Sequence, residues 1–178
     1  MALNALKRYQ TLIAEVDRLC RSIRQGYGEH IACKKGCAGN CCQRHISVFP
    51  IEAVSFAAAL QKLPQKMIHR IRHKARSSTT FGPCPLLEDG ACLMYDSRAI
   101  ICRTHGFPIL NRYKGIRTIG YCQQNFKHLP VIPDDALIEL GPLNNTLTSI
   151  NNQFLEETTA PWPYSDRLTI GEALLLDG

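Results

Sequence analysis

The feature that most constrains this chain is the crowding of eight of its nine cysteines into residues 33–122. The eight are Cys33, Cys37, Cys41, Cys42, Cys84, Cys92, Cys102 and Cys122. The first four have the spacing C-x3-C-x3-C-C, and the next three recur every eight to ten residues. A hydrophobic core does not require thiols, because free cysteine packs as a small apolar side chain. The pattern therefore indicates either disulfides or a metal held by thiolates.

The redox state of the compartment decides between these two chemistries. The chain begins MALNALKRYQTLIAEVDRLC, an amphipathic stretch with five charged residues that lacks the pattern of a secretory signal. No run approaches the roughly 18 apolar residues of a membrane span. We therefore expect a cytoplasmic protein without a membrane partner, whose thiols stay reduced and bind metal. An odd total of nine cysteines also fits poorly with a closed set of disulfides.

Length and composition favour a folded body that carries the metal site. A chain of 178 residues with 45% hydrophobic residues can bury a core, and we expect one domain over residues 1–178. Within it, residues 33–122 form the predicted cysteine-rich metal-binding core, on which a helix in 1–25 and helices in 134–178 pack. The formal charge of +6 counts every cysteine as neutral. Two four-thiolate zinc sites would leave about +2, which weakens an argument for nucleic-acid binding from charge.

Apolar spacing predicts helices on both sides of the cysteine-rich segment. Residues 3–24 carry one apolar stripe at helical spacing, formed by Leu6, Tyr9, Ile13, Val16, Cys20 and Ile23. Gly26 and Gly28 are expected to end this helix. Cys20 follows the stripe, so we interpret it as a core thiol outside the metal site. Further helices are predicted over residues 51–62, 64–75, 143–157 and 169–176, the last opening with a capping box.

Short elements are predicted between these helices. Residues 33–42 are expected to form a tight loop, and residues 46–49 and 92–95 short extended segments. Asp96 is expected to cap a short helix that ends at Cys102. Residues 109–119 alternate around a turn and predict a β-hairpin. The predicted fold class is mainly α with a cysteine-rich irregular metal-binding centre and a small β-hairpin, a small α+β domain.

The ordered motifs resemble a known family. After the first four cysteines the chain has Cys84-Pro85-Leu86-Leu87, Cys92-Leu93-Met94-Tyr95, Arg98 and Cys102-Arg103. This series is similar to the YkgJ-type cysteine-cluster family, described as zinc- or iron-chelating and carrying a CxxCxxCC signature. The resemblance covers roughly residues 33–107 and implies metal binding. Two departures are that each gap in the first motif has three residues and that Ala99 stands where the family has proline.

Spacing suggests how the thiols divide between sites. Adjacent side chains on extended or turn backbone point apart, so Cys41 and Cys42 are expected to serve different sites or to leave one thiol free. Cys33, Cys37 and one of this pair give three ligands from one loop, with Cys102 as a candidate fourth. Cys84 and Cys92 then either join that site or make a second one with Cys122 and the spare thiol.

The identity of the metal stays open between zinc and an iron–sulfur cluster. Eight thiols suffice for two tetrahedral Zn²⁺ sites or for one [4Fe-4S] cluster plus partners. All-thiolate ligation excludes magnesium and calcium as natural occupants. His30, His45 and His105 each lie three residues from a cysteine, and with eight thiols none is required as a ligand. Arg98 and Arg103 are expected to offset the charge of the thiolates and to donate hydrogen bonds to sulfur.

These observations predict a metal-binding protein that holds an iron–sulfur cluster or zinc, with a redox or metal-assembly accessory role. The alternative is a zinc-stabilised interaction module that binds protein or nucleic acid. The basic segment 66–76 is expected to be a solvated helix face, because aromatic residues do not interleave with its charges. Nucleic acid is therefore not the expected partner. No catalytic constellation is recognisable, so we do not expect an enzyme.

Overall fold

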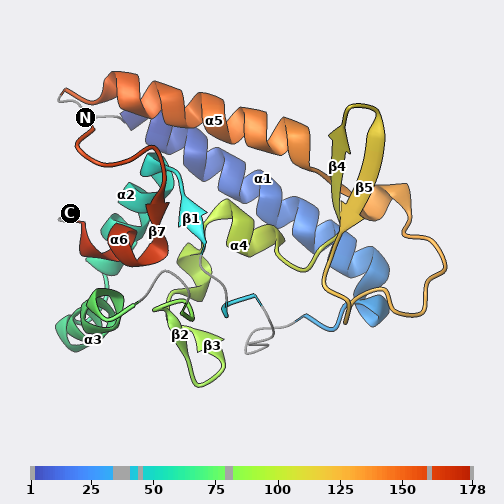
Figure 1. The fold of residues 1–178 in the computed structure, drawn as a ribbon, viewed down its shortest axis with the longest axis horizontal. Coiled ribbons are helices and arrows are strands. Elements are labelled where there is room, and N and C mark those ends of the chain that lie inside the picture. Colours follow the sequence, from blue (N-terminus) through green and yellow to red (C-terminus); the bar gives the residue numbers. More distant parts are fainter. Residues whose placement is uncertain (1–2, 34–40, 44–45, 79–81, 160–161, 177–178) are drawn as a thin grey trace.

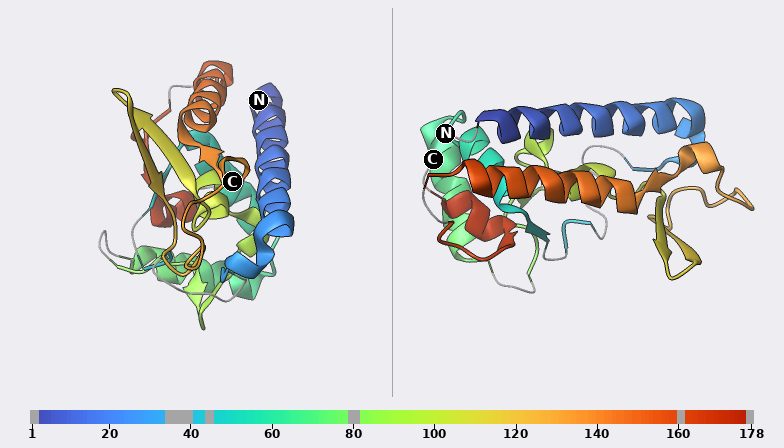
Figure 2. Two further views of the ribbon diagram at one scale, coloured as in Figure 1. Left: turned by 90° about the vertical axis from the view of Figure 1, so that its right-hand side faces the viewer. Right: turned by 90° about the horizontal axis from the view of Figure 1, so that it is seen from above.

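Two long helices form one side of the molecule. The computed structural model describes residues 3–33, 41–43, 46–78, 82–159 and 162–176. Helices α1 (Leu3–Tyr27) and α5 (Leu140–Glu157) lie side by side (Figures 1 and 2). Of the predicted stripe of α1, Tyr9, Val16, Cys20 and Ile23 are buried, whereas Leu6 and Ile13 are partly buried against the same core cluster. The helix continues past Gly26, and Tyr27 still packs on this cluster. None of the described helices is long and apolar enough to cross a membrane.

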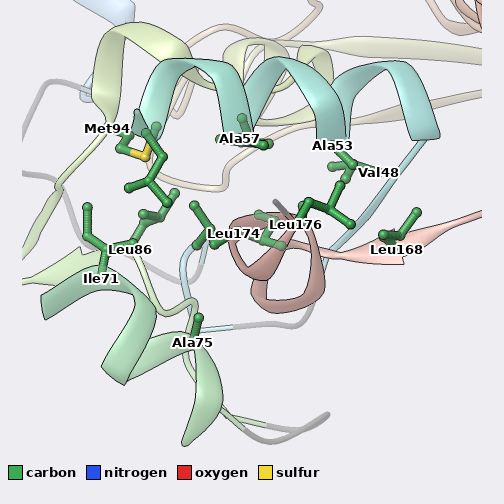
Figure 3. Close-up of a cluster of buried hydrophobic side chains, with 14 of the residues drawn as sticks. Val48, Ala53, Ala57, Ile71, Ala75, Leu86, Met94, Leu168, Leu174 and Leu176 are labelled. Carbon is green, nitrogen blue, oxygen red and sulfur yellow. The ribbon is translucent and has the colours of Figure 1, made fainter. Parts of the chain in front are cut away.

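A second core lies beside the first, and one helix contributes to both. Helices α2 (Pro50–Leu60), α3 (Gln65–Arg76) and α6 (Ile170–Leu175) surround this second cluster (Figure 3). Ile51 of α2 belongs to the first cluster, whereas Ala53 and Ala57 belong to the second. Helices α2 and α6 pack against each other through this second cluster. The prediction of one domain over residues 1–178 stays a prediction.

Short strands connect segments that are distant in sequence. β1 (Ser47–Val48) pairs antiparallel with β7 (Leu168–Thr169), and β2 (Leu87–Glu88) pairs antiparallel with β3 (Ala91–Cys92). β4 (Ile109–Tyr113) and β5 (Ile116–Gly120) form the predicted hairpin. β6 (Ile138–Glu139) adds to β4 in parallel, which sequence periodicity did not indicate. The turn residues Lys114 and Gly115 have φ of 48° and 80°, as a two-residue hairpin of this type requires.

The predictions for α2, α3, α5 and α6 are confirmed to within a few residues, and the fold is mainly helical with small sheets. Thr169 accepts a hydrogen bond from the Glu172 N–H at 3.0 Å, and Glu172 accepts one from the Thr169 N–H at 2.7 Å. This is the predicted capping box. Three 3-10 turns complete the described elements: Gly28–His30, Tyr95–Ser97 and Asp134–Ala136. Residues 34–40 of the predicted loop lie outside the described residues.

The region from residue 92 to residue 104 differs from the prediction. The extended segment ends at Cys92, and Tyr95 already begins a 3-10 turn. Asp96 lies inside that turn and does not cap the next helix, α4 (Ile100–Thr104), whose N-cap is Ala99. Arg98 has extended backbone, with φ −61° and ψ 145°, and separates the 3-10 turn from α4. The expectation of a single helix capped by Asp96 was therefore wrong.

The cap of α4 comes from another helix. Glu52 is 2% exposed, and its Oε1 accepts the N–H of Ile100, the first residue of α4, at 3.0 Å. Its Oε2 accepts the N–H of Phe49 at the start of α2, also at 3.0 Å. The Tyr9 hydroxyl of α1 lies 3.5 Å from Oε1. Burial raises the pKa of Glu52, and the two backbone N–H groups counteract this rise. One carboxyl group thus joins three helices.

We expect Glu52→Ala to lower the free energy of unfolding by about 2–4 kcal/mol, because it leaves the N–H groups of Phe49 and Ile100 without their acceptor. Chemical denaturation of the purified protein measures this change. Glu156→Ala is the matched control, because Glu156 is an exposed residue of α5 and its truncation should shift stability by at most about 0.5 kcal/mol. Equal midpoints for the two variants would contradict the role assigned to Glu52.

Candidate metal centre

Six of the eight predicted cysteines line one cavity. Its volume is about 390 Å³, and its walls include residues of α1, α4 and the loops around β2 and β3. The six are Cys33, Cys41, Cys42, Cys84, Cys92 and Cys102. Cys122 lines a neighbouring cavity of about 780 Å³, which Cys33 and Cys41 also line. Cys37 lies outside the described residues.

Backbone hydrogen bonds and core packing position Cys84, Cys92 and Cys102. The Cys84 N–H donates to the Cys42 carbonyl at 2.8 Å, which joins two cysteines 42 residues apart. Cys92 sits on β3 opposite Leu87, and Cys102 sits in α4. Cys84, Cys92 and Cys102 all pack against the second hydrophobic cluster. The hairpin of β2 and β3 and the helix α4 therefore present their thiols from the same core.

Burial opposes ionisation of these thiols. It raises the pKa of Cys84 to about 12, with further contributions from the nearby Cys42 and Cys92 thiolates. Burial also raises the pKa of Cys102, and the charges of Cys84, Cys92 and Cys42 add to the effect. The pKa of Cys92 is raised by burial and lowered by the Met94 N–H and the charge of Arg98. A soft cation would offset the repulsion between thiolates gathered here.

A second arrangement surrounds Cys33. Asn125 is 1% exposed; its Nδ2 donates to the Gly106 carbonyl at 2.7 Å and lies 3.2 Å from the Cys33 sulfur. Its Oδ1 accepts the N–H groups of Ala32 and Cys33 at 2.9 and 3.3 Å. The Cys122 N–H donates to the same Gly106 carbonyl at 3.3 Å. Asn125 thus holds the Cys33 backbone and sulfur beside the segment that carries Cys122.

Phe126, the residue after Asn125, holds the turn that carries Asn125 in place. Phe126 has φ of 55°, a left-handed conformation that bulky residues rarely adopt. Its N–H donates to the His30 carbonyl at 2.7 Å, and its ring stacks on the His30 ring at 6.4 Å between centroids. Sequence reasoning missed Asn125, because an isolated asparagine after the last cysteine carries no spacing signal. The structure finds it through its four contacts with residues 32, 33 and 106.

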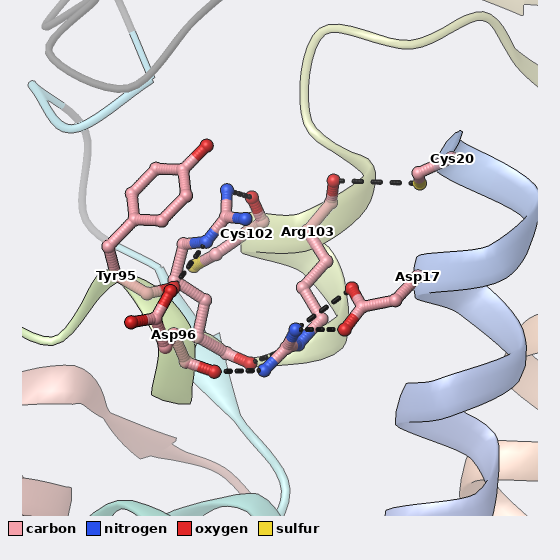
Figure 4. A network of polar contacts seen from close by, with 7 residues as sticks. Asp17, Cys20, Tyr95, Asp96, Cys102 and Arg103 are labelled. Carbon is pink, nitrogen blue, oxygen red and sulfur yellow. Dashed lines mark hydrogen bonds and ion pairs between the residues drawn. The ribbon is translucent and has the colours of Figure 1, made fainter. Parts of the chain in front are cut away.

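Two arginines organise the backbone around Cys102 (Figure 4). Arg98 donates to the carbonyls of Tyr95 at 2.8 Å and Cys102 at 3.1 Å. Arg103 is buried and donates to both carboxylate oxygens of Asp17 on α1, at 2.8 and 2.7 Å. It also donates to the carbonyls of Arg98 and Asp96 at 2.7 and 2.6 Å. These bonds go to oxygen, whereas the sequence predicted donation to sulfur.

Cys20 lies where the apolar stripe placed it. It is 9% exposed, belongs to the first core cluster, and its thiol lies 3.8 Å from the Arg103 carbonyl (Figure 4). Burial raises its pKa to about 11. Cys20 also borders the cavity of the six cysteines. Its exclusion from the metal site stays a prediction.

The basic helix α3 supports the cysteine hairpin. Arg70 and Lys74 approach the Glu88 carboxylate at 2.8 and 3.5 Å. The Lys74 amine also donates to the Leu87 carbonyl at 2.6 Å. Both acceptors belong to β2, the strand paired with the one that carries Cys92. Part of the positive charge of segment 66–76 therefore positions a cysteine-bearing strand.

The structure shows which of the described thiols share a hydrophobic core. It places Cys102 with Cys84 and Cys92 on one core, and Cys122 beside Cys33. Among the described residues, no three His, Cys, Asp or Glu side chains are gathered in an arrangement that would hold a metal ion. The cysteine-rich metal-binding centre and its ligands therefore stay a prediction. The donor set itself suits zinc or iron, because thiolates select soft metals. His105 lines both cavities, and His45 lies outside the described residues.

Comparison with known families agrees with this chemistry. Residues 32–125, more than half of the chain, match the family model CxxCxxCC, described as "Putative zinc- or iron-chelating domain". The chain belongs to this family. The match confirms the resemblance as far as metal chelation, and the YkgJ-type label stays a prediction. No match to the chain was found among the curated proteins or among the solved structures.

We expect Arg103→Lys to lower the free energy of unfolding by about 1–3 kcal/mol, because lysine cannot reproduce the guanidinium fork that joins Asp17 to α4. Arg18→Lys, at an exposed position of α1, is the matched control and should have little effect. Thermal denaturation compares the two. A melting temperature for Arg103→Lys equal to that of the control would argue against the buried fork.

We expect Gly106→Ala to destabilise the protein by about 1–3 kcal/mol. The φ of Gly106 is 93°, and an added Cβ would lie 2.8 Å from the Cys33 sulfur. Gly115→Ala is the control that separates backbone strain from the clash with Cys33. Gly115 also has a positive φ, 80°, but no atom lies within 4 Å of an added Cβ. Urea denaturation should show a larger loss for Gly106→Ala than for Gly115→Ala. Equal losses would mean that the contact with Cys33 contributes nothing.

Proposed function

We propose that this protein binds zinc or an iron–sulfur cluster through the thiolates of its clustered cysteines and serves as a redox or metal-assembly accessory protein in the cytoplasm. The proposed ligands are Cys33, Cys37, Cys41, Cys42, Cys84, Cys92, Cys102 and Cys122. The metal would stay bound to the protein as a cofactor, and no catalysed reaction is proposed.

The observation that carries the proposal is that cysteines from three separate segments line one cavity. Cys33, Cys41 and Cys42 precede α2, Cys84 precedes the β2–β3 hairpin, Cys92 lies on β3, and Cys102 lies in α4. Helices α2 and α3 intervene in sequence, so the tertiary fold brings these segments together. A set of core thiols would need no such convergence. The family match over residues 32–125 supports the same chemistry.

The remaining residues of the cavity suit a thiolate centre. Arg98 supplies positive charge beside it, while the charge of Arg103 is paired with Asp17. The hydrogen bonds of both arginines hold carbonyls of Tyr95, Asp96, Arg98 and Cys102 in place. Phe56, Leu86 and Phe107 add apolar side chains to the lining of the cavity. A bound metal would supply the positive charge that keeps several neighbouring thiols deprotonated. The protein contributes the sulfur donors, their orientation and the low-dielectric surroundings.

Metal analysis of protein purified without oxygen tests the proposal and separates its two forms. A colourless protein with at least one zinc per chain indicates zinc sites. A brown protein with about four iron and matching sulfide per chain, whose visible absorption is bleached by dithionite, indicates a cluster. Full-length protein without zinc, iron or another transition metal would refute the proposed function.

We expect Cys102→Ala to lose metal and Cys20→Ala to retain the full content, because Cys102 lies among the other motif cysteines and Cys20 follows the core stripe of α1. The two substitutions remove the same atom from neighbouring walls of one cavity, so each is the other's control. Cys20→Ala should cost roughly 1 kcal/mol as a core truncation. The reverse pattern in metal content would place α1 in the site and remove Cys102 from it.

A further inference from the structure

We propose that the cysteines form two separate metal centres and that the division falls between the adjacent residues Cys41 and Cys42. Cys42, Cys84, Cys92 and Cys102 are the proposed ligands of one four-thiolate centre, and their side chains would have to close on the metal, because among the described residues no three of them are gathered in an arrangement that would hold it. Cys33, Cys41 and Cys122 belong to a second centre, which Asn125 organises. This inference rests on the proposed function and specifies which thiols share a metal.

The first centre is built on the second hydrophobic core. Cys84, Cys92 and Cys102 all pack against that core and line the 390 Å³ cavity, and none of the three lines the larger cavity. The 2.8 Å hydrogen bond from the Cys84 N–H to the Cys42 carbonyl holds the backbone of Cys42 next to that of Cys84. Cys42 likewise lines the first cavity and not the second. Four thiols are a complete tetrahedral set for zinc or a complete set for one cluster.

The second centre is built on the segment after α4. Gly106 lies between Cys33 and Cys122: a Cβ added to it would be 2.8 Å from the Cys33 sulfur and 3.6 Å from the Cys122 Cβ. Asn125 contacts the backbone and sulfur of Cys33, and the Gly106 carbonyl accepts from both Asn125 and Cys122. Cys122 lines the larger cavity and not the first. Cys122 therefore lies next to Cys33, on the other side of Gly106.

Cys41 is assigned to the second centre because of the cavity that it lines. It lines the larger cavity together with Cys33 and Cys122, whereas its neighbour Cys42 does not. Side chains of adjacent residues in non-helical backbone project in different directions, so one metal rarely receives both. Cys33 and Cys41 also border the first cavity, which places the two centres next to each other. The Asn125 Nδ2 is 3.2 Å from the Cys33 sulfur and acts on the second centre as a positioning donor.

Metal content of paired variants tests the division. Full-length protein and the variants Cys84→Ala, Cys102→Ala, Cys122→Ala, Cys84→Ala/Cys102→Ala and Cys84→Ala/Cys122→Ala are purified without oxygen, and zinc, iron and sulfide are measured per chain. Alanine removes the sulfur donor with little change in volume. We expect Cys84→Ala/Cys102→Ala to lose no more metal than either single variant. We expect Cys84→Ala/Cys122→Ala to lose the sum of its two single losses.

Two results would overturn the division. One is complete loss of metal from Cys122→Ala alone, and the other is a Cys84→Ala/Cys122→Ala variant that loses no more than Cys84→Ala. Either would show a single shared centre while leaving the proposed function intact. Wild-type protein without metal would instead refute the proposed function itself.

Asn125 gives an independent test of the same division. Asn125→Asp keeps the Oδ1 acceptor and removes the donor to the Cys33 sulfur. In the Cys84→Ala/Cys102→Ala background, which should retain only the second centre, competition with a chelator should show an affinity lowered by about tenfold or more. In the Cys122→Ala background, which should retain only the first, it should leave the affinity unchanged. Asn145→Asp, at an exposed position of α5, is the control in both. Equal weakening in both backgrounds would contradict the assignment of Asn125.

Discussion

The buried carboxyl group of Glu52 is the interaction on which the rest of the structure depends. It accepts the first N–H of α4 and the N–H that precedes α2, and the Tyr9 hydroxyl of α1 lies next to it. A helix of five residues cannot hold itself in water, because its unpaired N–H groups and its nucleation cost outweigh its few internal bonds. Helix α4 is therefore stable only where α2 supplies its cap, and that position determines where Cys102 lies.

Arg103 anchors the other side of α4 to the long helix α1. Its guanidinium is almost fully buried, where a charge is tolerated only with partners, and Asp17 together with two carbonyls provides them. The carbonyls belong to Asp96 and Arg98, so the same group also fixes the irregular chain that leads into the helix. Arg98 adds a bond to the Cys102 carbonyl. The candidate site is thus positioned by the carboxyl groups of Glu52 on α2 and Asp17 on α1, two helices that carry no proposed ligand, and by Arg103 of α4 itself.

The two hydrophobic cores give the cysteines two different supports. Cys84, Cys92 and Cys102 pack on the core between α2, α3 and α6, whereas Cys33 and Cys122 meet at Gly106, next to Phe107 and Phe126 of the core between α1 and α5. A side chain held by one packed core moves with that core, because close-packed interiors resist independent shifts. Cys41 lines both cavities and Cys42 lines the smaller one, so the adjacent pair borders the sites next to both cores.

Sequence by itself determined what depends on local geometry and on chemistry. The apolar stripe of α1, the Thr169–Glu172 capping box and the Lys114–Gly115 turn are each set by residues within a few positions, and the thiol content and motif order were enough to predict a metal-binding protein. Tertiary structure alone decided what depends on distant partners. Glu52 replaced Asp96 as the cap of α4, Cys102 joined Cys84 and Cys92, and Asn125 reached Cys33 across 92 residues. Spacing along the chain carries no information on such contacts, because they follow from which cores the segments pack against.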